Sequence, residues 1–481
     1  MKRILLVVLF GWLTLQGQGI LKKSYLLYEN GNDNYIFDGF LYGNGIVDLL
    51  VRDSLVWAAT GYGLNKTDDG GKTWRNFRTI HYGGKGGVAA MEYMMDKQTL
   101  WISTAFDTTA LEQNMSAGGG LSYTRDGGAT WTHIRQPVDS RDETEYSPTT
   151  TNISNITYDI GFIDSTIWIT SWAGGLRKST DMGKTWQVVT IDGKPFRAAN
   201  DNLIHLAFSV LYADGELWVG TAGGIGKSTD GGETFEIYKH NASHSSISGD
   251  FVVALGYQEY DGTIWAATIE AGDTSEFRAV SLTSNSGASW KTTLPGVFAH
   301  NFAFDGPKVY VATDQGMYVS DDKGANWYKL PPIKDKQNGD EILTETYYSG
   351  AVQKVNGITR LWVGSADGLA YTEDNGNNWH VIRSYVRLSK RPKPEVYAYP
   401  SPFSPSRHDY LRFECGDADP SQIDIKIYDF SMEQVRALPV TDYKPKWDGK
   451  NDAGEQVASG VYHFRADVKG KIVWGKIVVI N

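Results

Sequence analysis

Cysteine is almost absent from this chain: its 481 residues contain one, Cys415. A single thiol excludes internal disulfides, so the fold has to be stabilised by its hydrophobic core. We interpret Cys415 as a small buried hydrophobic residue. Basic residues are also in deficit, with 46 Lys and Arg against 56 Asp and Glu and a formal net charge of −10. Because nucleic-acid-binding proteins present a basic face, this balance argues against a nucleic-acid partner.

Long apolar runs are absent after the first residues of the chain. Lys2-Arg3 precedes an apolar stretch from Ile4 to Leu15, and Gly17-Gln18-Gly19 supplies small residues for cleavage. This order is typical of a secretory signal peptide over residues 1–19, too short to cross a bilayer. We therefore expect an exported protein without a transmembrane segment after signal removal, either secreted or at a bacterial cell surface.

Motifs for metal and cofactor chemistry are missing as well. His240 and His244 are four residues apart, but the Ser- and Asn-rich sequence around them indicates a loop and not a zinc-binding helix. No phosphate-binding glycine loop or nucleophile elbow occurs. The sequence therefore predicts no cofactor, no metal and no assignable catalytic residue.

What the chain does contain is one eight-residue pattern, Ser/Thr-x-Asp-x-Gly-x-x-Trp/Phe, in seven copies 37 to 57 residues apart. We call each copy a box. The boxes run over Thr67–Trp74, Thr124–Trp131, Ser179–Trp186, Ser228–Phe235, Thr283–Trp290, Ser320–Trp327 and Thr372–Trp379. Periods of this length are typical of solenoids, propellers or arrays, whose units cannot bury their apolar faces alone.

Each unit reads as four short strands. A β-branched strand such as Ile46–Val51 comes first, and a second strand carries an aromatic residue such as Trp57 or Trp218. A glycine-rich turn, a third strand leading into the box and a fourth leaving it complete the unit. The sequence thus predicts an all-β, seven-bladed β-propeller over residues 20–388. It leaves open how the ring closes, because residues 20–44 could add an outer strand to the last blade.

The boxes have a structural interpretation. The carboxylate of an Asp after a strand can accept hydrogen bonds from backbone N–H groups ahead of it, and the Ser/Thr hydroxyl can do the same. The Gly then allows the chain to reverse, and the closing aromatic residue packs between sheets. We assign this turn role to Asp69, Asp126, Asp181, Asp230, Asn285, Asp322 and Asp374.

The pattern resembles the Asp-box, or BNR, repeat of sialidase-like and sortilin-like propellers, over about Gly45 to Ser384. The resemblance implies that the boxes lie away from the face that carries function. It identifies a fold and not an activity, because the same repeats occur in sialidases, receptors, polysaccharide hydrolases and photosystem assembly factors. Sialidases also carry an Arg-Ile-Pro motif, which is absent here; the segment before the first box offers only Arg52 in a predicted turn.

Candidate ligand-binding residues lie in the segments that differ between units. The turns Phe106 to Gly119 and Glu270 to Arg278 are enlarged, and a polar link runs from Val138 to Thr157. Trp172 occupies a turn where other units have small residues. An exposed Trp near carboxylates suits sugar or peptide recognition, whereas a Trp packed on a neighbouring blade would be structural. The candidates are Trp172, Phe106, Glu143, Glu145, Tyr146 and Glu270.

After the last box the composition changes. Five prolines between Pro392 and Pro405 mark a stiff linker, placed at 389–398, and short alternating strands over 399–481 predict a small β-sandwich. Tyr399-Pro-Ser-Pro-Phe403, Trp447-Asp-Gly-Lys-Asn451 and Ser459-Gly-Val-Tyr462 resemble the FlgD-type immunoglobulin-like domain. Closely similar domains are sorting signals for type IX secretion, so the resemblance implies a secretion-machinery partner.

Three functional hypotheses follow, of which the last is a purely structural surface component. The first is an exported recognition protein whose propeller loops bind a glycan, a peptide or a protein. The alternative is a glycoside hydrolase, sialidase-like or polysaccharide-cleaving, with an unrecognised carboxylate pair.

Overall fold

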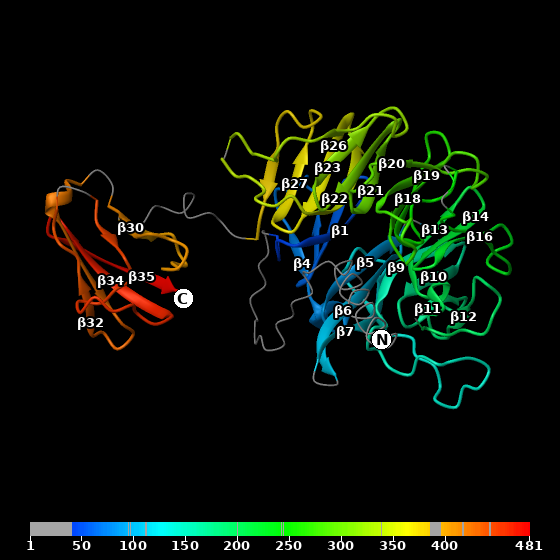
Figure 1. Cartoon of the computed structure of the whole chain (residues 1–481), viewed down its shortest axis with the longest axis horizontal. Coiled ribbons are helices and arrows are strands. Elements are labelled where there is room, and N and C mark those ends of the chain that lie inside the picture. The colour runs from blue at the N-terminus through cyan, green and yellow to red at the C-terminus, as the bar shows by residue number, and fades with distance from the viewer. Residues whose placement is uncertain are drawn as a thin grey trace. The chain divides into compact units, whose positions relative to one another are not determined.

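The computed structural model describes residues 41–481 except 95, 97, 111–112, 200, 242, 244, 338, 385–395, 416–417 and 442–443. The predicted signal peptide, the opening residues 20–40, His244 and most of the predicted linker lie outside these residues. The chain divides into two compact units, Met1–Tyr385 and Val386–Asn481 (Figure 1).

The larger unit is a β-propeller. Its described residues form seven four-stranded antiparallel sheets, each a meander in which consecutive strands pair. The first four sheets are β1–β4 (Ile46–Arg52, Leu55–Thr60, Gly63–Thr67, Arg75–Phe77), β5–β8 (Gly87–Tyr93, Leu100–Ala110, Gln113–Thr124, Thr132–Ile134), β9–β12 (Thr157–Ile163, Thr166–Ser171, Gly175–Ser179, Gln187–Val189) and β13–β16 (Ala207–Ala213, Glu216–Thr221, Gly224–Ser228, Glu236–Tyr238).

The remaining sheets are β17–β20 (Phe251–Gln258, Thr263–Ile269, Ala279–Thr283, Lys291–Thr293), β21–β24 (Ala299–Asp305, Lys308–Thr313, Gly316–Ser320, Tyr328–Lys329) and β25–β28 (Tyr347–Val355, Ile358–Ser365, Gly368–Thr372, His380–Ile382). Helix is confined, in the described propeller, to α2 (Thr79–Tyr82) and the 3-10 turn η1 (Leu203–His205).

The ring closes through its innermost strands. Each sheet contacts the next through its first strand, and β25 of the last sheet contacts β1 of the first. The last sheet draws all its strands from one continuous segment, so it borrows none from the described N-terminal residues. Residues 41–44 form no strand; instead Leu41 is buried, and the Asn44 side chain accepts a hydrogen bond from the Ser384 amide at 2.7 Å.

Every box forms the same hydrogen-bonded turn between the third and fourth strands. In the fourth copy the Ser228 hydroxyl donates to Asp230 Oδ1 at 2.7 Å and accepts from the Gly232 amide at 2.8 Å. The Thr234 amide donates to the same Asp230 oxygen at 3.0 Å, and its hydroxyl donates to Oδ2 at 2.6 Å. These bonds hold the pKa of Asp230 well below its usual value.

The seventh box position carries a contact that the sequence pattern left unassigned. It is occupied by Thr, Ser or Asn in all seven copies, and its side chain bonds the Asp or Asn at the third position. Asn285 is the one exception to Asp at the third position, and its amide oxygen still accepts from Thr283 and from the Ser289 amide. The turn thus needs an oxygen acceptor and not a charge.

Tryptophan pairs join neighbouring sheets at three interfaces. Trp290 of the fifth box meets Trp218 of the preceding sheet edge-on, with ring centroids 6.1 Å apart, and Trp327 meets Trp265 in the same way at 6.1 Å. Trp74 of the first box contacts Trp362 of the last sheet at 6.4 Å, so this packing also crosses the closure. Such pairs contribute about 0.5–1.5 kcal/mol each beyond the burial of their area.

The smaller unit is a two-sheet β-sandwich. One sheet contains β29 (Tyr397–Tyr399), β30 (Leu411–Glu414) and β33 (Lys446–Trp447). The other has the order β32 (Gln434–Ala437), β31 (Ile423–Tyr428), β34 (Gly460–Val468) and β35 (Lys471–Val479), with the 3-10 turn η3 (Pro420–Gln422) before β31. Cys415 is buried in the shared core, where burial raises the pKa of its thiol to about 11.

We expect Asp230→Ala to lower the melting temperature by roughly 2–4 °C, because it removes the acceptor that holds the turn. Asp230→Asn should retain most of the stability, since Asn285 fills the same place in the fifth box. Because the folded pKa of Asp230 is depressed, the difference between wild type and Asp230→Asn should be present above pH 4 and shrink as pH falls further. Thermal unfolding across pH measures this; equal losses for Ala and Asn would contradict the acceptor role.

Candidate functional site

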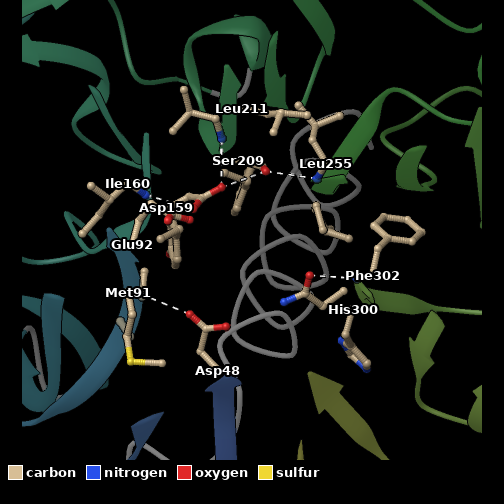
Figure 2. Close-up of a pocket in the computed structure, with 18 of the residues that line it drawn as sticks. Asp48, Met91, Glu92, Asp159, Ile160, Ser209, Leu211, Leu255, His300 and Phe302 are labelled. Carbon is tan, nitrogen blue, oxygen red and sulfur yellow. Dashed lines mark hydrogen bonds between the residues drawn. The ribbon is translucent and has the colours of Figure 1, made fainter. Parts of the chain in front are cut away.

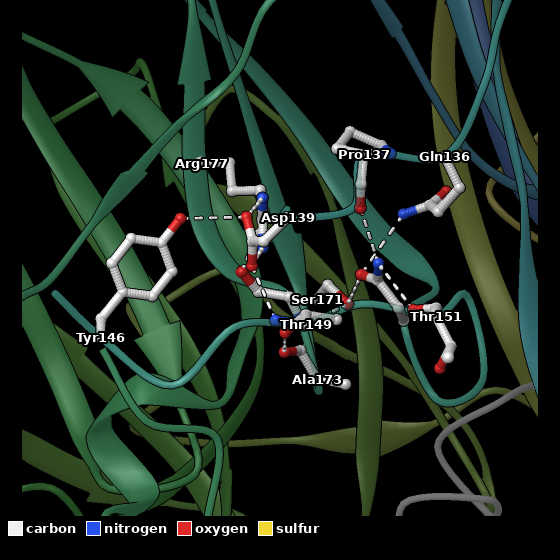
Figure 3. Close-up of polar contacts among 11 residues, drawn as sticks. Gln136, Pro137, Asp139, Tyr146, Thr149, Thr151, Ser171, Ala173 and Arg177 are labelled. Carbon is white, nitrogen blue, oxygen red and sulfur yellow. Dashed lines mark hydrogen bonds and ion pairs between the residues drawn. The ribbon is translucent and has the colours of Figure 1, made fainter. Parts of the chain in front are cut away.

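The connection between β8 and β9, residues 135–156, is the longest link between sheets that the described propeller contains, and we call it the strap. Connections beyond roughly 12–15 residues without secondary structure are uncommon in compact domains and are usually functional or disordered. The strap is held by a dense set of hydrogen bonds (Figure 3). It is therefore an ordered loop whose conformation the rest of the propeller determines.

A buried ion pair anchors the strap. Arg177 of β11 donates from Nη1 and Nη2 to the two carboxylate oxygens of Asp139, at 2.6 and 2.8 Å, and both side chains are about 95% buried. Asp139 also accepts from the Tyr146 hydroxyl and the Thr149 amide. Although burial works to raise it, the hydrogen bonds and charge of Arg177 hold the pKa of Asp139 below its usual value.

Sequence reasoning missed Arg177. The residue two positions before each box is uncharged in the other six units (Asn65, Ser122, Gly226, Ser281, Tyr318 and Ala370). A buried pair with one partner removed leaves an uncompensated charge, so a charged residue at an otherwise uncharged core position signals a partner elsewhere. Comparing the copies at this position would have revealed it.

The strap lies beside two other segments that the sequence singled out. The Gly118 amide donates to the Asn152 carbonyl and the Ser154 amide donates to the Ser116 carbonyl, which joins the strap to the β6–β7 hairpin. The Ala173 amide donates to the Ser154 carbonyl, which joins it to the turn after β10. The structure thus brings the link after the second box, the enlarged segment of the second unit and the Trp172 turn together on one face.

Two aromatic candidates are placed differently from the expectation of exposed binding residues. Phe106 is 8% exposed, because the predicted enlarged turn is a continuation of β6 and β7 and not a loop. The Trp172 ring packs against Phe208 and Phe251, at 5.5 and 6.2 Å between centroids, and is half-buried. Trp172 therefore packs on neighbouring sheets, as expected for a Trp with a structural role, although part of its surface is still exposed.

The polar candidates of the strap remain accessible. Glu145 is exposed, Glu143 is half-buried and accepts a hydrogen bond from the Glu145 amide, and Tyr146 packs on Phe196 while its hydroxyl reaches Asp139. Glu270 comes from a different sheet and forms an ion pair with Arg278 at 3.5 Å. Its neighbours Ile269 and Ala271 share a hydrophobic cluster with Trp172, so Glu270 lies on the same face.

A second region is a cavity of about 260 Å³ on the propeller axis, lined by residues from all seven first strands. Figure 2 shows Asp48, Glu92 and Asp159 on one part of its wall. None of the described residues that line it is Arg or Lys. The sequence did not single out these carboxylates, because each lies in an ordinary-looking β-strand.

Two of the three acids connect neighbouring sheets. Asp48 Oδ2 accepts a hydrogen bond from the Met91 amide of the next first strand at 3.2 Å. Asp159 Oδ2 accepts from the Ser209 hydroxyl and the Val210 amide, both at 2.9 Å, and Ser209 in turn accepts from the Leu255 amide. Asp48, Asp159 and Ser209 each pair with the penultimate residue of their second strand, so these are equivalent positions with a shared structural role.

The cavity alters the ionisation of its acids. Burial raises the pKa of Glu92 to about 8, and the Asp159 and Asp48 carboxyl groups add to this rise. Burial also raises the pKa of Asp159 to about 6, against the hydrogen bonds that it accepts. A protonated and an ionised carboxyl group are what acid–base chemistry requires, but ligand pockets usually enclose about 300–1,000 Å³, more than this cavity.

Other kinds of site find little support in the part of the chain that the structure describes. Three or more His, Cys, Asp or Glu side chains do not gather there in a way that could hold a metal ion. Nor does any helix among these residues have the length and apolar character needed to cross a bilayer.

Comparison with known proteins identifies the fold. No protein-family model matches the sequence, and no curated protein matches it. Among solved structures, the chain is similar to the GH74 enzyme of Niastella koreensis (15% identity, TM-score 0.54, 91% of this chain and 73% of the other). It is similar also to the GH74 xyloglucanase of Xanthomonas campestris (12%, 0.51, 92% and 68%).

A further similar structure is PorZ, described as a bacterial surface component of the type IX secretion system of Porphyromonas gingivalis (18% identity, TM-score 0.48). It covers 92% of this chain, which spans 60% of the length of PorZ. At identities of 12–15%, the GH74 likeness concerns the fold, and it supports the β-propeller.

Glu92→Gln should make the protein relatively more stable at pH 8–9 than at pH 5. Burial raises the pKa of the Glu92 carboxyl group from about 4.3 in the unfolded chain to about 8 in the folded protein. The folded protein therefore loses stability as pH rises between these two pKa values, and Glu92→Gln removes that loss. Denaturant unfolding between pH 5 and 9 measures the difference. The exposed Glu145→Gln is the matched control and should show no such trend. A stability difference between Glu92→Gln and wild type that stays constant from pH 5 to 9 would contradict a protonated Glu92.

Proposed function

We propose that this chain is an exported recognition protein of a bacterial cell surface. Its propeller binds a partner, a glycan or a protein segment, through the face that carries the strap. The observation that supports this most directly is the buried Asp139–Arg177 pair, which holds a long polar loop in one conformation. A preorganised loop loses little conformational entropy on binding, which is the advantage of rigid recognition surfaces.

The exposed chemistry of the strap suits such a role. Arg141, Asp142 and Glu145 are exposed at its outer part, and the half-buried Trp172 lies in the adjoining turn. Charged donors and acceptors beside a partly exposed aromatic ring can bind sugar hydroxyls or a peptide backbone. None of these side chains takes part in the Asp139–Arg177 ion pair. The residues that hold the strap in place are therefore different from those available to a partner.

We further propose that the C-terminal unit serves sorting or anchoring, with the secretion machinery as its partner. The FlgD-like sequence motifs support this, and so does the two-sheet sandwich into which residues 397–479 fold. The predicted signal peptide supports export in the same way.

The competing proposal is a glycoside hydrolase. It is favoured by the raised pKa values of Glu92 and Asp159, which face one cavity. Against it, both oxygens of Asp159 accept hydrogen bonds from the protein, and the cavity is small for a saccharide. The sialidase form also needs arginines for a substrate carboxylate, and none lines the cavity in the described residues. Recognition is therefore the better-supported function.

The triple variant Arg141→Ala/Asp142→Ala/Glu145→Ala should bind the partner at least 10-fold more weakly while its melting temperature stays within about 1 °C of wild type. Binding is measured on an array of bacterial surface glycans and, in parallel, by capture from a cell-surface extract. The matched control is Lys72→Ala/Asp68→Ala/Asp321→Ala, which removes the same charges from the box turns. Equal binding by the two triple variants would contradict the proposal that the strap binds the partner. Absence of binding to every glycan on the array would direct the search to a protein partner.

Purified protein should release no reducing ends from xyloglucan or from sialylated glycans, because the cavity is small for a saccharide and Asp48 and Asp159 are engaged in hydrogen bonds between sheets. Turnover that Glu92→Gln and Asp159→Asn both abolish, without loss of folding, would overturn recognition in favour of the hydrolase. Turnover that survives both variants would place an active site elsewhere.

A further inference from the structure

The C-terminal unit exposes an unusually large share of hydrophobic side chains. Nine of the eighteen large hydrophobic side chains that are exposed in the described residues belong to this unit, which is about a fifth of the chain. Trp474, Ile472 and Val461 are 50%, 52% and 46% exposed. All three lie on β34 and β35 of the four-stranded sheet of this unit.

Strand register places these residues on the same side. Ile425 and Ile427 of β31, Phe464 of β34 and Ile477 of β35 are buried in the sandwich core. Because side chains alternate along a strand, the residues between them point away from the core. They form rows across β31, β34 and β35: Lys426–Arg465–Trp474, then Tyr428–His463–Lys476.

These two rows combine cations with aromatic rings. Lys426 stands directly opposite Arg465, and like charges facing each other across strands are destabilising unless an anion lies over them. Within the described residues, neither Lys426 nor Lys476 belongs to an ion pair, while Arg465 is 3.4 Å from Asp467. The Trp474 and Tyr428 rings lie 5.5 Å apart, between centroids.

The row on the other side is different in charge. It consists of Asp424, Asp467 and the exposed Ile472. Asp424 and Asp467 thus line one margin of the face, and the cationic side chains Lys426, Arg465 and Lys476 lie in the two rows above. We call these six residues, Lys426, Arg465, Trp474, Tyr428, His463 and Lys476, the basic–aromatic face.

We propose that the basic–aromatic face docks on an anionic lipid surface. Trp and Tyr favour the boundary between headgroups and acyl chains, and Lys and Arg are attracted to anionic headgroups. The exposed aliphatic neighbours Ile472 and Val461 distinguish a lipid from other anionic partners. They gain by entering an apolar layer, whereas a polysaccharide or nucleic acid offers them no such environment. This surface is independent of the strap and of the partner proposed for it.

The docking is peripheral in character. Its binding energy comes from shallow insertion of Trp474 and its aliphatic neighbours together with charge attraction, and the latter is screened by salt. The face therefore binds reversibly, more tightly to anionic than to zwitterionic bilayers, and less tightly as ionic strength rises.

The test is flotation of the full chain with vesicles of phosphatidylcholine containing 30% phosphatidylglycerol, against vesicles of pure phosphatidylcholine. Each basic residue near an anionic surface changes the partition about five-fold. Lys426→Gln/Arg465→Gln/Lys476→Gln should therefore weaken binding to the anionic vesicles about 100-fold. The matched control, Lys72→Gln/Lys184→Gln/Lys291→Gln, removes three exposed propeller lysines and should bind as wild type does. The apolar N-terminal residues are present in every variant, so differences report the face alone.

Two further variants test the charge and the apolar contribution separately. Lys426→Arg/Lys476→Arg keeps the charge and should bind normally, and Trp474→Ser/Ile472→Ser should weaken binding to both kinds of vesicle about 10-fold. Thermal melts verify that each variant is folded. The proposal is overturned if the charge triple binds as its control does, or if wild type does not prefer anionic vesicles at 50 mM salt. It is equally overturned if wild type binds dextran sulfate but no vesicles, which would make the face an anionic-glycan site.

Discussion

Mutual burial of the sheet faces is the constraint on which the rest of the propeller depends. Strands such as β14 and β18 are buried along almost their whole length, so each sheet carries apolar residues on both sides and is unstable alone. Box tryptophans such as Trp290 and Trp327 provide that cover by packing on the second-strand tryptophan of the sheet before. Because the Trp74–Trp362 contact continues this series across the closure, the ring needs no shared strand among its described residues.

This constraint also explains where polar groups are placed. First strands converge on the axis, where their amides face a small cavity and need acceptors. Asp48, Asp159 and Ser209 supply those acceptors and connect one first strand to the next. Asp and Ser can serve either this hydrogen-bonding role or catalysis, so their presence does not identify an active site. The raised pKa of Glu92 is explained by its burial among the first strands and does not require a catalytic role. Perturbed ionisation marks a functional site only when the surroundings can also admit a substrate.

The two proposed surfaces differ in how they are built. The strap is a loop held rigid by a buried charge pair, and its accessible side chains are few and polar. The basic–aromatic face is a regular sheet surface, exposed because the sandwich buries only one side of each sheet. A rigid loop can discriminate between partners, whereas a flat face of mixed cationic and aromatic character suits a broad, uniform surface.

The propeller fold was predictable because short-range sequence patterns specify its repeating unit. Box spacing, strand alternation and turn residues recur in every unit, and each signal is contained within a few residues of sequence. The C-terminal sandwich was likewise indicated by alternating strands, and a turn role for box residues such as Asp230 follows from its immediate neighbours. The seventh box position was in reach too, since Thr, Ser or Asn fills it in every copy.

The two candidate surfaces could not be predicted in the same way, because they depend on contacts between residues that are distant in sequence. The repeat pattern carries no information about such contacts. Arg177 meets Asp139 across 38 positions, and Phe106 is buried where β6 and β7 extend as a hairpin that is hydrogen-bonded to the strap. Trp172 has aromatic neighbours on two other sheets, and Lys426, Arg465 and Trp474 share a row only through strand register. The sequence by itself determined the repeating unit, because turns and strand alternation are short-range. Only the tertiary structure decided which side chains remain accessible and which are buried, because burial depends on the sheets that close around them.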